Sequence, residues 1–480
     1  MFLADLHIHS RFSRATAKDI TVQNLDAWAR IKGINVLGTG DFTHPKWRDE
    51  LHEHLVRDEA SGLYKLRGPS EDLKIVPPSA ACANQAPPLF CLQTEISSIY
   101  KKNGRVRKVH NLLFVPTLED ADRLSERLGK IGNITSDGRP ILGLDSRNLL
   151  ELLLETVPEG ILIPAHIWTP WFSLFGSKSG FDSIEECFED LTPHIFALET
   201  GLSSDPPMNR YISALDRFAL VSNSDAHSGS KLGREVNLFE GKPGFSEIFQ
   251  SIRASARHDV QSDLSTRFLG TLEFFPEEGK YHLDGHRACR LSLNPLETRQ
   301  NNGICPVCGK PLTIGVLHRV MELADRAEPL PPQGSPDYHS IMPLLEITAE
   351  LLNAGTTSMK VQQKYGSILS HLGSEMAILA TMPVQDIRSF WPELGEGIAR
   401  LREGKVHLKA GYDGEFGQVR LFEPEELGFK AKTGRRTRSS SNTPSTTQEL
   451  QRPAENMQTL SLFQSMGPTK PQEVHKERTY

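Results

Sequence analysis

Residues that can bind metal ions recur in short motifs along the first 230 positions of the chain. The set comprises six histidines, two aspartates and a glutamate: His7, His9, Asp41, His44, Glu95, His110, His166, Asp225 and His227. Imidazole nitrogens and carboxylate oxygens suit Zn, Mg, Mn or Fe, and a mixed set does not select among these ions. Clustered divalent ions promote phosphate ester hydrolysis, because one ion lowers the pKa of a bound water while others hold the phosphate oxygens. We therefore predict a site for two or three ions that hydrolyses a phosphate ester.

Short apolar runs that read as strands precede or border these motifs. Strands are predicted over seven segments, residues 2–6, 35–38, 90–93, 111–115, 160–164, 195–198 and 219–222. Helical patterns at 22–31 and 144–156 fall between several of them, and this alternation indicates a parallel α/β sheet. The carboxyl ends of parallel strands emerge on one face, so the metal-binding residues are expected to meet there. Spacing alone allows either a barrel or an open sheet.

One pair of these residues can be placed by strand register. An Asn-Gly dipeptide at 103–104 is a strong two-residue turn signal and predicts a hairpin over residues 94–115. In the register that this turn sets, Glu95 lies opposite Leu112. His110 then shares a face with Glu95, at a diagonal of roughly 7–8 Å. We expect these two side chains to share one metal ion or to flank a pair of ions.

The order of the motifs resembles the PHP (polymerase and histidinol phosphatase) family over residues 1 to about 230, and we assign residues 1–240 to this catalytic domain. The resemblance implies a distorted seven-stranded (β/α) barrel with a trinuclear metal site. It implies one ion on His7, His9, Glu95 and Asp225, a second on Glu95, His110 and His166, and further ligands in Asp41, His44 and His227. Asp225 and His227 are the candidates for proton transfer. The family often has histidine directly after aspartate in its second motif, whereas Phe42 stands between them here.

Glu199 also follows a predicted strand, but the resemblance implies no role for it. We expect its carboxylate to support the ligands from a second layer.

A second metal site is predicted in the middle of the chain, over residues 275–320. Cys305-x-x-Cys308 is a zinc-knuckle spacing, and Cys289 lies upstream. A closed structural zinc site needs a fourth ligand. His286 is preferred because His286-x-x-Cys289 repeats the same spacing, and His282 is the alternative.

A PHP domain followed by such a zinc module resembles the endonuclease Q family, to about residue 425. The resemblance implies an endonuclease that cuts duplex DNA 5′ to deaminated bases (uracil, hypoxanthine) or abasic sites, leaving 3′-hydroxyl and 5′-phosphate ends. It also implies that the damaged base leaves the duplex, as enzymes acting on a base generally require. The mainly helical residues 321–427 are expected to clamp the duplex, or else to pack without contacting DNA.

Two groups of residues near the metal site are candidates for DNA contact. The hairpin turn is basic, and its candidates are Lys101, Lys102, Arg105, Arg107 and Lys108. Three aromatic residues follow the ligand at 166 and could stack on a base or wedge the duplex: Trp168, Trp171 and Phe172. The alternatives are a solvated hairpin tip and ordinary packing.

The polar residues 428–480 predict a disordered tail with a basic root. One apolar patch interrupts it and resembles the peptide that binds the bacterial DNA sliding clamp: Gln458, Leu460, Leu462 and Phe463.

The composition, with 38% hydrophobic and 24% charged residues in a chain of 480, is that of a globular protein. No apolar run reaches the roughly 18 residues of a membrane helix, and no secretory signal is recognisable, so we expect a cytoplasmic protein. The net charge of −6 argues against nucleic acid coating the whole surface but allows local binding. A small-molecule phosphatase and a non-catalytic DNA-binding scaffold are the alternative functions.

Overall fold

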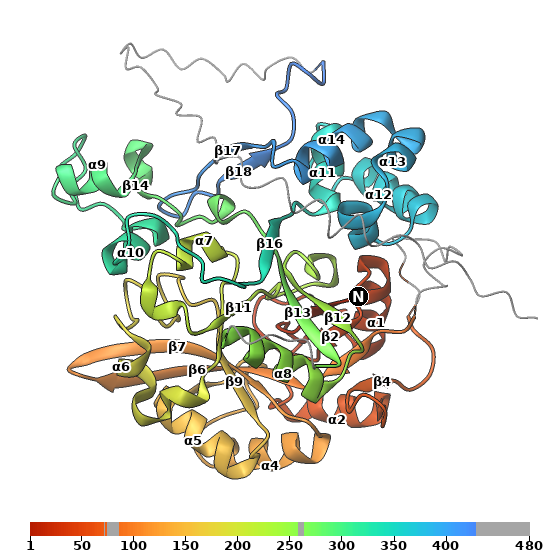
Figure 1. Cartoon of the computed structure of the whole chain (residues 1–480), viewed down its shortest axis with the longest axis vertical. Coiled ribbons are helices and arrows are strands. Elements are labelled where there is room, and N and C mark those ends of the chain that lie inside the picture. The colour runs from red at the N-terminus through yellow and green to blue at the C-terminus, as the bar shows by residue number, and fades with distance from the viewer. Residues whose placement is uncertain (72, 74–85, 258–263, 429–480) are drawn as a thin grey trace, which may run out of the picture.

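The computed structural model describes residues 1–71, 73, 86–257 and 264–428, and an α/β body makes up its larger part (Figure 1). The body contains β1 (Phe2–Asp5), α1 (Val22–Lys32), β2 (Val36–Gly38), α2 (Pro45–His54), β3 (Leu55–Arg57), β4 (Tyr64–Leu66), β5 (Leu89–Cys91), β6 (Gln93–Lys102), β7 (Arg105–Phe114), α4 (Leu118–Gly129), β8 (Ile141–Leu142), α5 (Ser146–Thr156), β9 (Ile161–Pro164), α6 (Ile184–Phe188), β10 (Ala197–Glu199), α7 (Pro206–Asn209), β11 (Ala219–Val221), β12 (Val236–Gly241), α8 (Phe245–Ala256) and β13 (Thr266–Glu273). All seven predicted strands and both predicted helices therefore form, with small shifts at their ends.

The strands of the body divide among separate sheets. One sheet begins with β16 (Asp337–Ser340) and has the order β16-β13-β12-β1-β2-β5-β4-β3; a second has the order β8-β6-β7-β9, and a third β10-β11. The pairs β1–β2, β2–β5 and β10–β11 are parallel, whereas β6–β7, β7–β9 and β1–β12 are antiparallel. The parallel arrangement expected from the sequence is thus confirmed only for part of the body.

The described strands do not close into the expected seven-stranded barrel. Where two sheets meet, single backbone contacts replace a ladder, as between Val115 N and Leu92 O at 3.3 Å. Asp41, His166 and Asp225, which follow β2, β9 and β11, have φ values of 46°, 28° and 46°, and this left-handed conformation lies outside the range of a strand. These three metal-binding side chains therefore stand on turns after the strands, whereas Glu95 and His110 lie within the continuous ladder of β6 and β7.

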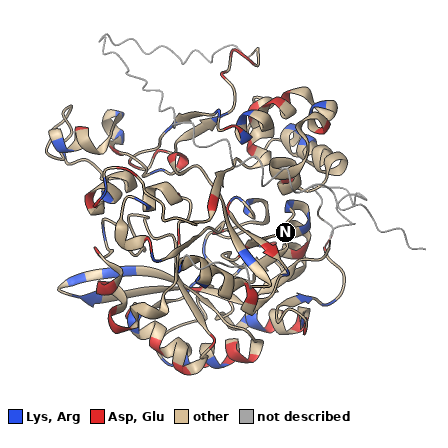
Figure 2. Ribbon diagram, in the orientation of Figure 1, with Lys and Arg blue, Asp and Glu red and all other residues tan. Residues whose placement is uncertain are grey.

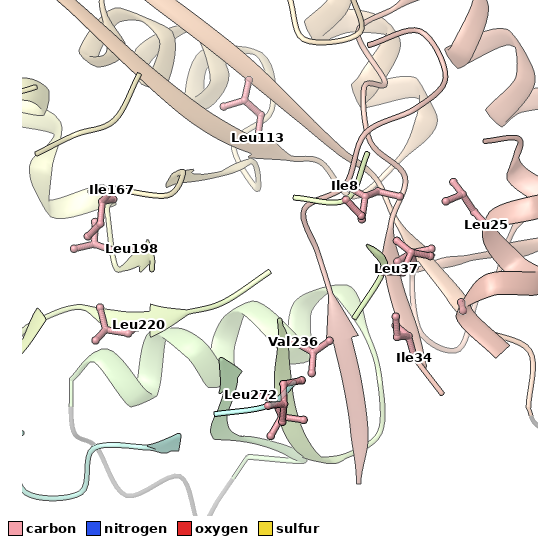
Figure 3. Close-up of a cluster of buried hydrophobic side chains, with 14 of the residues drawn as sticks. Ile8, Leu25, Ile34, Leu37, Leu113, Ile167, Leu198, Leu220, Val236 and Leu272 are labelled. Carbon is pink, nitrogen blue, oxygen red and sulfur yellow. The ribbon is translucent and has the colours of Figure 1, made fainter. Parts of the chain in front are cut away.

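Apolar side chains fill the space between the sheets. Figure 3 shows side chains from several of these strands turned into a common interior, among them Leu37, Leu113, Leu198, Leu220 and Val236. Helix α5 packs against β7 and β9, and α8 against β10, β11 and β13 (Figure 1). This burial holds the strand ends, and thus the metal-binding residues, in fixed relative positions.

Two smaller units lie at one end of the body, with a short hairpin drawn between them (Figure 1). The first unit contains β14 (Asp284–His286), β15 (Leu291–Leu293), α9 (Pro295–Gln300) and α10 (Val316–Leu323), followed by β16 (Asp337–Ser340). The second is helical, as predicted, with α11 (Leu344–Leu351), α12 (Met359–Leu372), a π-helical turn (Ala377–Thr381), α13 (Val384–Phe390) and α14 (Pro392–Arg402). The hairpin is β17 (His407–Lys409) and β18 (Gln418–Arg420). No helix in the described ranges is long and apolar enough to cross a membrane.

A buried ion pair joins the helical unit to the α/β body. Lys32, at the end of α1, donates from Nζ to Glu375 Oε2 at 2.7 Å, and each side chain is only 2% exposed. The hydroxyl of Tyr365 donates to the same oxygen at 2.5 Å, and the backbone N–H of Leu344 to Oε1 at 3.1 Å. Glu375 is therefore surrounded by donors from both units.

Replacing Lys32 with methionine is expected to destabilise the protein by about 3–5 kcal/mol, because the carboxylate of Glu375 stays buried without its cation. Urea unfolding followed by tryptophan fluorescence measures the change. The control is Lys130→Met, which breaks the surface pair with Glu126 and is expected to cost about 1 kcal/mol or less, since those side chains are 70% and 71% exposed. Equal losses for the two variants would contradict the anchoring role of the buried pair.

Candidate active site

Four side chains from three parts of the body converge on one point. The Nε2 atoms of His7 and His9 lie 3.7 and 3.2 Å from Glu95 Oε2. The same two nitrogens lie 3.6 and 3.1 Å from Asp225 Oδ1. His7 and His9 follow β1, Glu95 lies in β6, and Asp225 follows β11. The predicted convergence of these residues is what the structure shows.

Seven of the nine predicted ligands fall into three overlapping groups whose ligand atoms lie within 4.8 Å of one another. The groups are His7, His9 and Glu95; His9, Asp225 and His227; and Glu95, His110 and His166. Because Glu95 and His9 each belong to two groups, neighbouring ions would share ligands. Such sharing is typical of a compact multi-metal centre.

The donor atoms that would face an ion have no other hydrogen-bond partner. Nε2 of His7, Nε2 of His9 and Oδ1 of Asp225 are buried and lack a partner within the part of the chain that the structure describes. Buried polar atoms are rarely left in this state, because an unpaired one costs free energy. The three atoms point to the same place, so a divalent cation fits the residues present.

The charges around the point are predominantly negative. Burial alone lowers the pKa of His7, but the carboxylates of Glu199 and Asp225 outweigh it and raise that pKa to about 10. Burial raises the pKa of Glu95, yet His110 and Arg139 hold it well below its ordinary value. Carboxylates that raise the pKa of a buried histidine also attract metal cations, because both effects come from the same negative charge.

Two carboxylates lie behind the ligands and orient them. Both carboxylate oxygens of Glu199 lie 3.1 Å from Nδ1 of His7, and its Oε2 also accepts a hydrogen bond from the backbone N–H of His166 at 2.8 Å. Asp41 Oδ1 lies 2.9 Å from Nδ1 of His9, and Asp41 Oδ2 accepts hydrogen bonds from Ser10 and Ser13. Such carboxylate–histidine pairs fix the ring orientation of metal-binding histidines. Glu199 was expected to support the metal ligands from behind, and its contacts with His7 and His166 match that expectation.

Asp41 and His44 fall in none of the three groups, although both were predicted ligands. The oxygens of Asp41 are already occupied by hydrogen bonds. His44 precedes the first turn of α2, and its Nε2 lies 3.1 Å from the carbonyl oxygen of Thr135. The intervening Phe42 is fully buried in the core, which separates the two motif residues. Direct ligation by Asp41 or His44 stays a prediction.

Replacing Glu199 with glutamine is expected to weaken metal binding by about 10- to 100-fold, because the amide holds His7 less well than a carboxylate does. Metal titration by calorimetry tests this, together with the metal concentration that half-saturates activity. The side-chain volume is kept, so the fold should be retained. Unchanged metal affinity would show that Glu199 does not support the ligand.

Arg139 is a residue of this site that the sequence pattern did not indicate. It donates from Nη1 to Glu95 Oε2 at 3.0 Å, and its side chain is 26% exposed. The preceding Gly138 lets the loop approach, since a Cβ there would lie 2.3 Å from Asp41 Oδ2. The loop belongs to no predicted strand end, so no spacing signal marked this arginine. It adds a partly exposed cation next to the carboxylates.

The second predicted metal site also assembles. His286, Cys289, Cys305 and Cys308 form one group, with Nδ1 of His286 3.1 Å from Sγ of Cys289 and 3.3 Å from Sγ of Cys308. Burial raises the pKa of Cys305, but backbone N–H groups outweigh it, so that pKa falls to about 7. Three sulfurs and one imidazole form the closed donor set of structural zinc. His286, and not the alternative His282, completes the group.

Comparison with known proteins identifies the family. The model of the MJ0043 C-terminal domain matches residues 343–405. A crystal structure of the lesion-specific endonuclease PfuEndoQ from Pyrococcus furiosus is 32% identical, covers 90% of this chain and 97% of its own, and has a TM-score of 0.74. The structure of endonuclease Q with a 27-mer duplex carrying an abasic lesion at its active site has 32% identity, coverages of 90% and 99%, and a TM-score of 0.73.

This chain belongs to the endonuclease Q family. It is also 30% identical to the uncharacterized protein YqxK of Bacillus subtilis, over 87% of this chain and 98% of YqxK. The uncharacterized protein MJ0043 of Methanocaldococcus jannaschii is 30% identical over 54% of this chain. That match spans about a third of the Methanocaldococcus protein, 32% of its length.

The long hairpin of this endonuclease Q relative has the predicted register. Lys102 pairs with Arg105 and Glu95 with Leu112, and Nδ1 of His110 lies 2.7 Å from Glu95 Oε1. The register matters because a shift of one residue between the strands would turn His110 to the opposite face from Glu95.

The basic residues of the hairpin differ in their surroundings, although Figure 2 shows Lys and Arg along both of its strands. Arg107 is buried, donates to the carbonyl of Gly180 and lies over the ring of Phe181, so it does not face solvent as a phosphate contact would. Lys102 is paired with Asp145 and Glu189. Lys101 and Arg105 are exposed, so they are free to contact a phosphate as predicted, and Lys108 is half-buried.

The three predicted aromatic contacts also separate into two kinds. Trp168 is fully buried and donates from Nε1 to Asn209, so it packs in the core and does not meet a base. Trp171 is 40% exposed. The ring of Phe172 lies 4.9 Å from that of His110. Only Trp171 and Phe172 are placed where a substrate could reach them.

Proposed function

We propose that this protein is a metal-dependent DNA repair endonuclease. It hydrolyses the phosphodiester 5′ to a deaminated base or an abasic site. The observation that carries the proposal is the set of three overlapping ligand groups around Glu95, in a chain that aligns over 90% of its length with an endonuclease Q bound to abasic DNA. Cleavage leaves 3′-hydroxyl and 5′-phosphate ends.

The ligand groups support the metal-binding roles proposed for these residues. His7, His9, Glu95 and Asp225 would hold one ion, and Glu95, His110 and His166 a second, while His227 completes a third set with His9 and Asp225. Divalent ions such as Zn, Mg or Mn lower the pKa of a bound water and neutralise phosphate charge. Asp225 and His227 are 26% and 30% exposed, more than the other ligands, so they face the substrate and are proposed to move protons.

We also propose that the separate sheets together form the wall of a distorted seven-stranded barrel. Supporting contacts at the joins are the bridge between Ile8 and Ala226 and the hydrogen bond from Ile167 N to Glu199 O at 3.1 Å. The chain then divides into a catalytic domain (1–240), a zinc module (275–320), a helical DNA-binding region (321–427) and a tail (428–480).

The helical region and zinc module are proposed to grip duplex DNA on the side of the metal centre. The clamp-binding peptide of the tail, Gln458 to Phe463, lies outside the described residues and stays a prediction. Deleting residues 430–480 tests it. Binding to the clamp should then be lost, while nicking of an oligonucleotide should be kept. We expect the enzyme to act in the cytoplasm.

The alternative functions are less favoured. A small-molecule phosphatase has no use for the zinc module and the helical unit, which align with endonuclease Q along with the rest of the chain. A non-catalytic scaffold gains nothing from the unpaired donor atoms of His7, His9 and Asp225.

The test is a nicking assay on end-labelled duplexes that carry uracil, hypoxanthine or an abasic site, with Mg²⁺ or Mn²⁺ and an undamaged duplex alongside. A single cut 5′ to the lesion is expected. Phosphate release from small monoesters without any cut in DNA would assign the protein to the phosphatases.

Replacing Arg139 with alanine is expected to lower kcat by about 10²–10³-fold, the loss typical when one donor to a developing oxyanion is removed. The structure places its guanidinium beside Glu95, where a phosphate held by the ions would also lie within reach. Single-turnover kinetics measures the rate, and metal content is measured in parallel. Arg139→Lys keeps the charge and should lose less. A loss explained wholly by lower metal content would contradict a contact with the phosphate.

A further inference from the structure

A second set of aromatic side chains lies beyond Trp171 and comes from two other parts of the chain. The rings of Trp171 and Tyr281 meet edge to face, with centroids 5.5 Å apart. Lys280 Nζ lies 6.0 Å from the centroid of Tyr281 and 5.4 Å from that of Phe416. Loop 166–180, the first residues of the zinc module and the hairpin β17–β18 therefore contribute to one strip.

The strip is continuous with the metal centre. Phe172 follows Trp171, its carbonyl accepts the backbone N–H of His110 at 3.1 Å, and its ring contacts the ring of that ligand. Lys108 Nζ lies 5.1 Å from the centroid of Phe172. Phe172 has a φ of 60°, a conformation that bulky residues adopt only where surrounding structure imposes it. One lysine thus lies at the metal end of the strip and another at the far end.

The outermost rings are exposed on a fixed support. Trp171 is 40% and Phe416 71% exposed, and they are the two aromatic residues among the exposed large hydrophobic side chains of the described ranges. The loop that carries Phe416 is hydrogen-bonded to the first residues of the zinc module, with Gly414 N donating to Lys280 O at 2.8 Å and Gly417 N to Glu278 O at 3.0 Å. Exposure of Phe416 is therefore built into the backbone of the hairpin.

We infer that Trp171, Tyr281, Lys280 and Phe416 form a stacking platform for unpaired nucleotides of the DNA strand that extends from the metal centre. Exposed rings with interspersed cations bind single-stranded nucleic acid, because every base has a face that stacks and every phosphate carries a charge. Bases inside an intact duplex offer no free face, so the platform selects DNA that is already opened at the lesion. The inference rests on the proposed function and adds a site outside the ligand groups.

The test compares two variants of Phe416, one without an aromatic ring and one that keeps the ring. Phe416→Leu keeps an apolar side chain without the aromatic face, whereas Phe416→Tyr keeps the face. Binding is measured by fluorescence anisotropy on a lesion duplex whose neighbouring base pairs are mismatched, with 2-aminopurine beside the lesion reporting stacking. Phe416→Leu is expected to weaken binding about tenfold, the lower part of the range for one base–aromatic stack, and to reduce the 2-aminopurine quenching. Phe416→Tyr should match the wild type.

A control variant, Ile131→Ala, removes an apolar side chain that is 43% exposed elsewhere on the body and should leave binding unchanged. Wild-type binding by Phe416→Leu would overturn the platform. An equal loss on fully paired, undamaged duplex would also overturn it, because the contact would then not depend on unpaired bases. Nicking by the wild type is scored separately: if no substrate is cut but Phe416→Leu still weakens binding, the proposed function fails while the platform stands.

Discussion

Replacing Glu95 with glutamine is expected to reduce nicking of lesion-bearing DNA by about a thousandfold or more, because metal ions supply several kcal/mol of transition-state stabilisation. The two oxygens of Glu95 serve different groups. Oε1 lies 2.7 and 3.1 Å from the ring nitrogens of His110 and His166, and Oε2 lies 3.2 Å from Nε2 of His9. Glutamine keeps the volume but removes the charge that two ions would share.

The measurements are the single-turnover nicking rate and the metal content of the purified protein by mass spectrometry. The matched control is Glu126→Gln on the exposed surface of α4, where the side chain is 71% exposed and pairs only with Lys130 among the contacts described. That variant should retain full activity and metal. A Glu95→Gln protein with wild-type metal content and nicking would refute the shared-ligand centre.

Replacing Cys305 with serine is expected to remove one zinc ion per chain and to unfold the zinc module. Cys305 is fully buried and belongs to the donor group of His286, Cys289 and Cys308. Binding of structural zinc contributes about 10–16 kcal/mol in small zinc-finger peptides, far more than the packing of so short a module can supply. Limited proteolysis should then cut within residues 275–320, and lesion-DNA binding should fall because the module no longer supports Tyr281.

Two histidine variants sharpen this test. His286→Ala should lose the same zinc ion, while His282→Ala should keep it, since only His286 lies in the donor group. Zinc is counted by a chromogenic chelator after unfolding. Retention of zinc by His286→Ala with loss by His282→Ala would reverse the assignment of the fourth ligand. The active-site ions are distinguished because they are removed by Glu95→Gln and not by Cys305→Ser.

Features that depend on neighbouring residues could be predicted from the sequence. The Asn-Gly turn sets the hairpin register, so the positions of Glu95 and His110 followed from counting along two strands. The repeated Cys-x-x-Cys and His-x-x-Cys spacings predicted which residues form the His/Cys group, because residues this close in sequence are brought together by a single turn. The order of strand-terminal ligands indicated the metal centre for a similar reason: strand direction alone decides at which end a side chain emerges.

Features that depend on how distant segments pack were decided only by the tertiary structure. Arg139 reaches Glu95 from the segment just before the two-residue strand β8, which the sequence did not predict. Trp168 and Arg107 turned out to be buried although their residue types suggested DNA contact. The strands also divide among separate sheets that do not close into a regular barrel, which the positions of the strands along the chain could not reveal. Local patterns encode which residues face the interior of an element, but burial and contact across elements depend on the whole chain, since each is fixed by packing against residues far away in sequence.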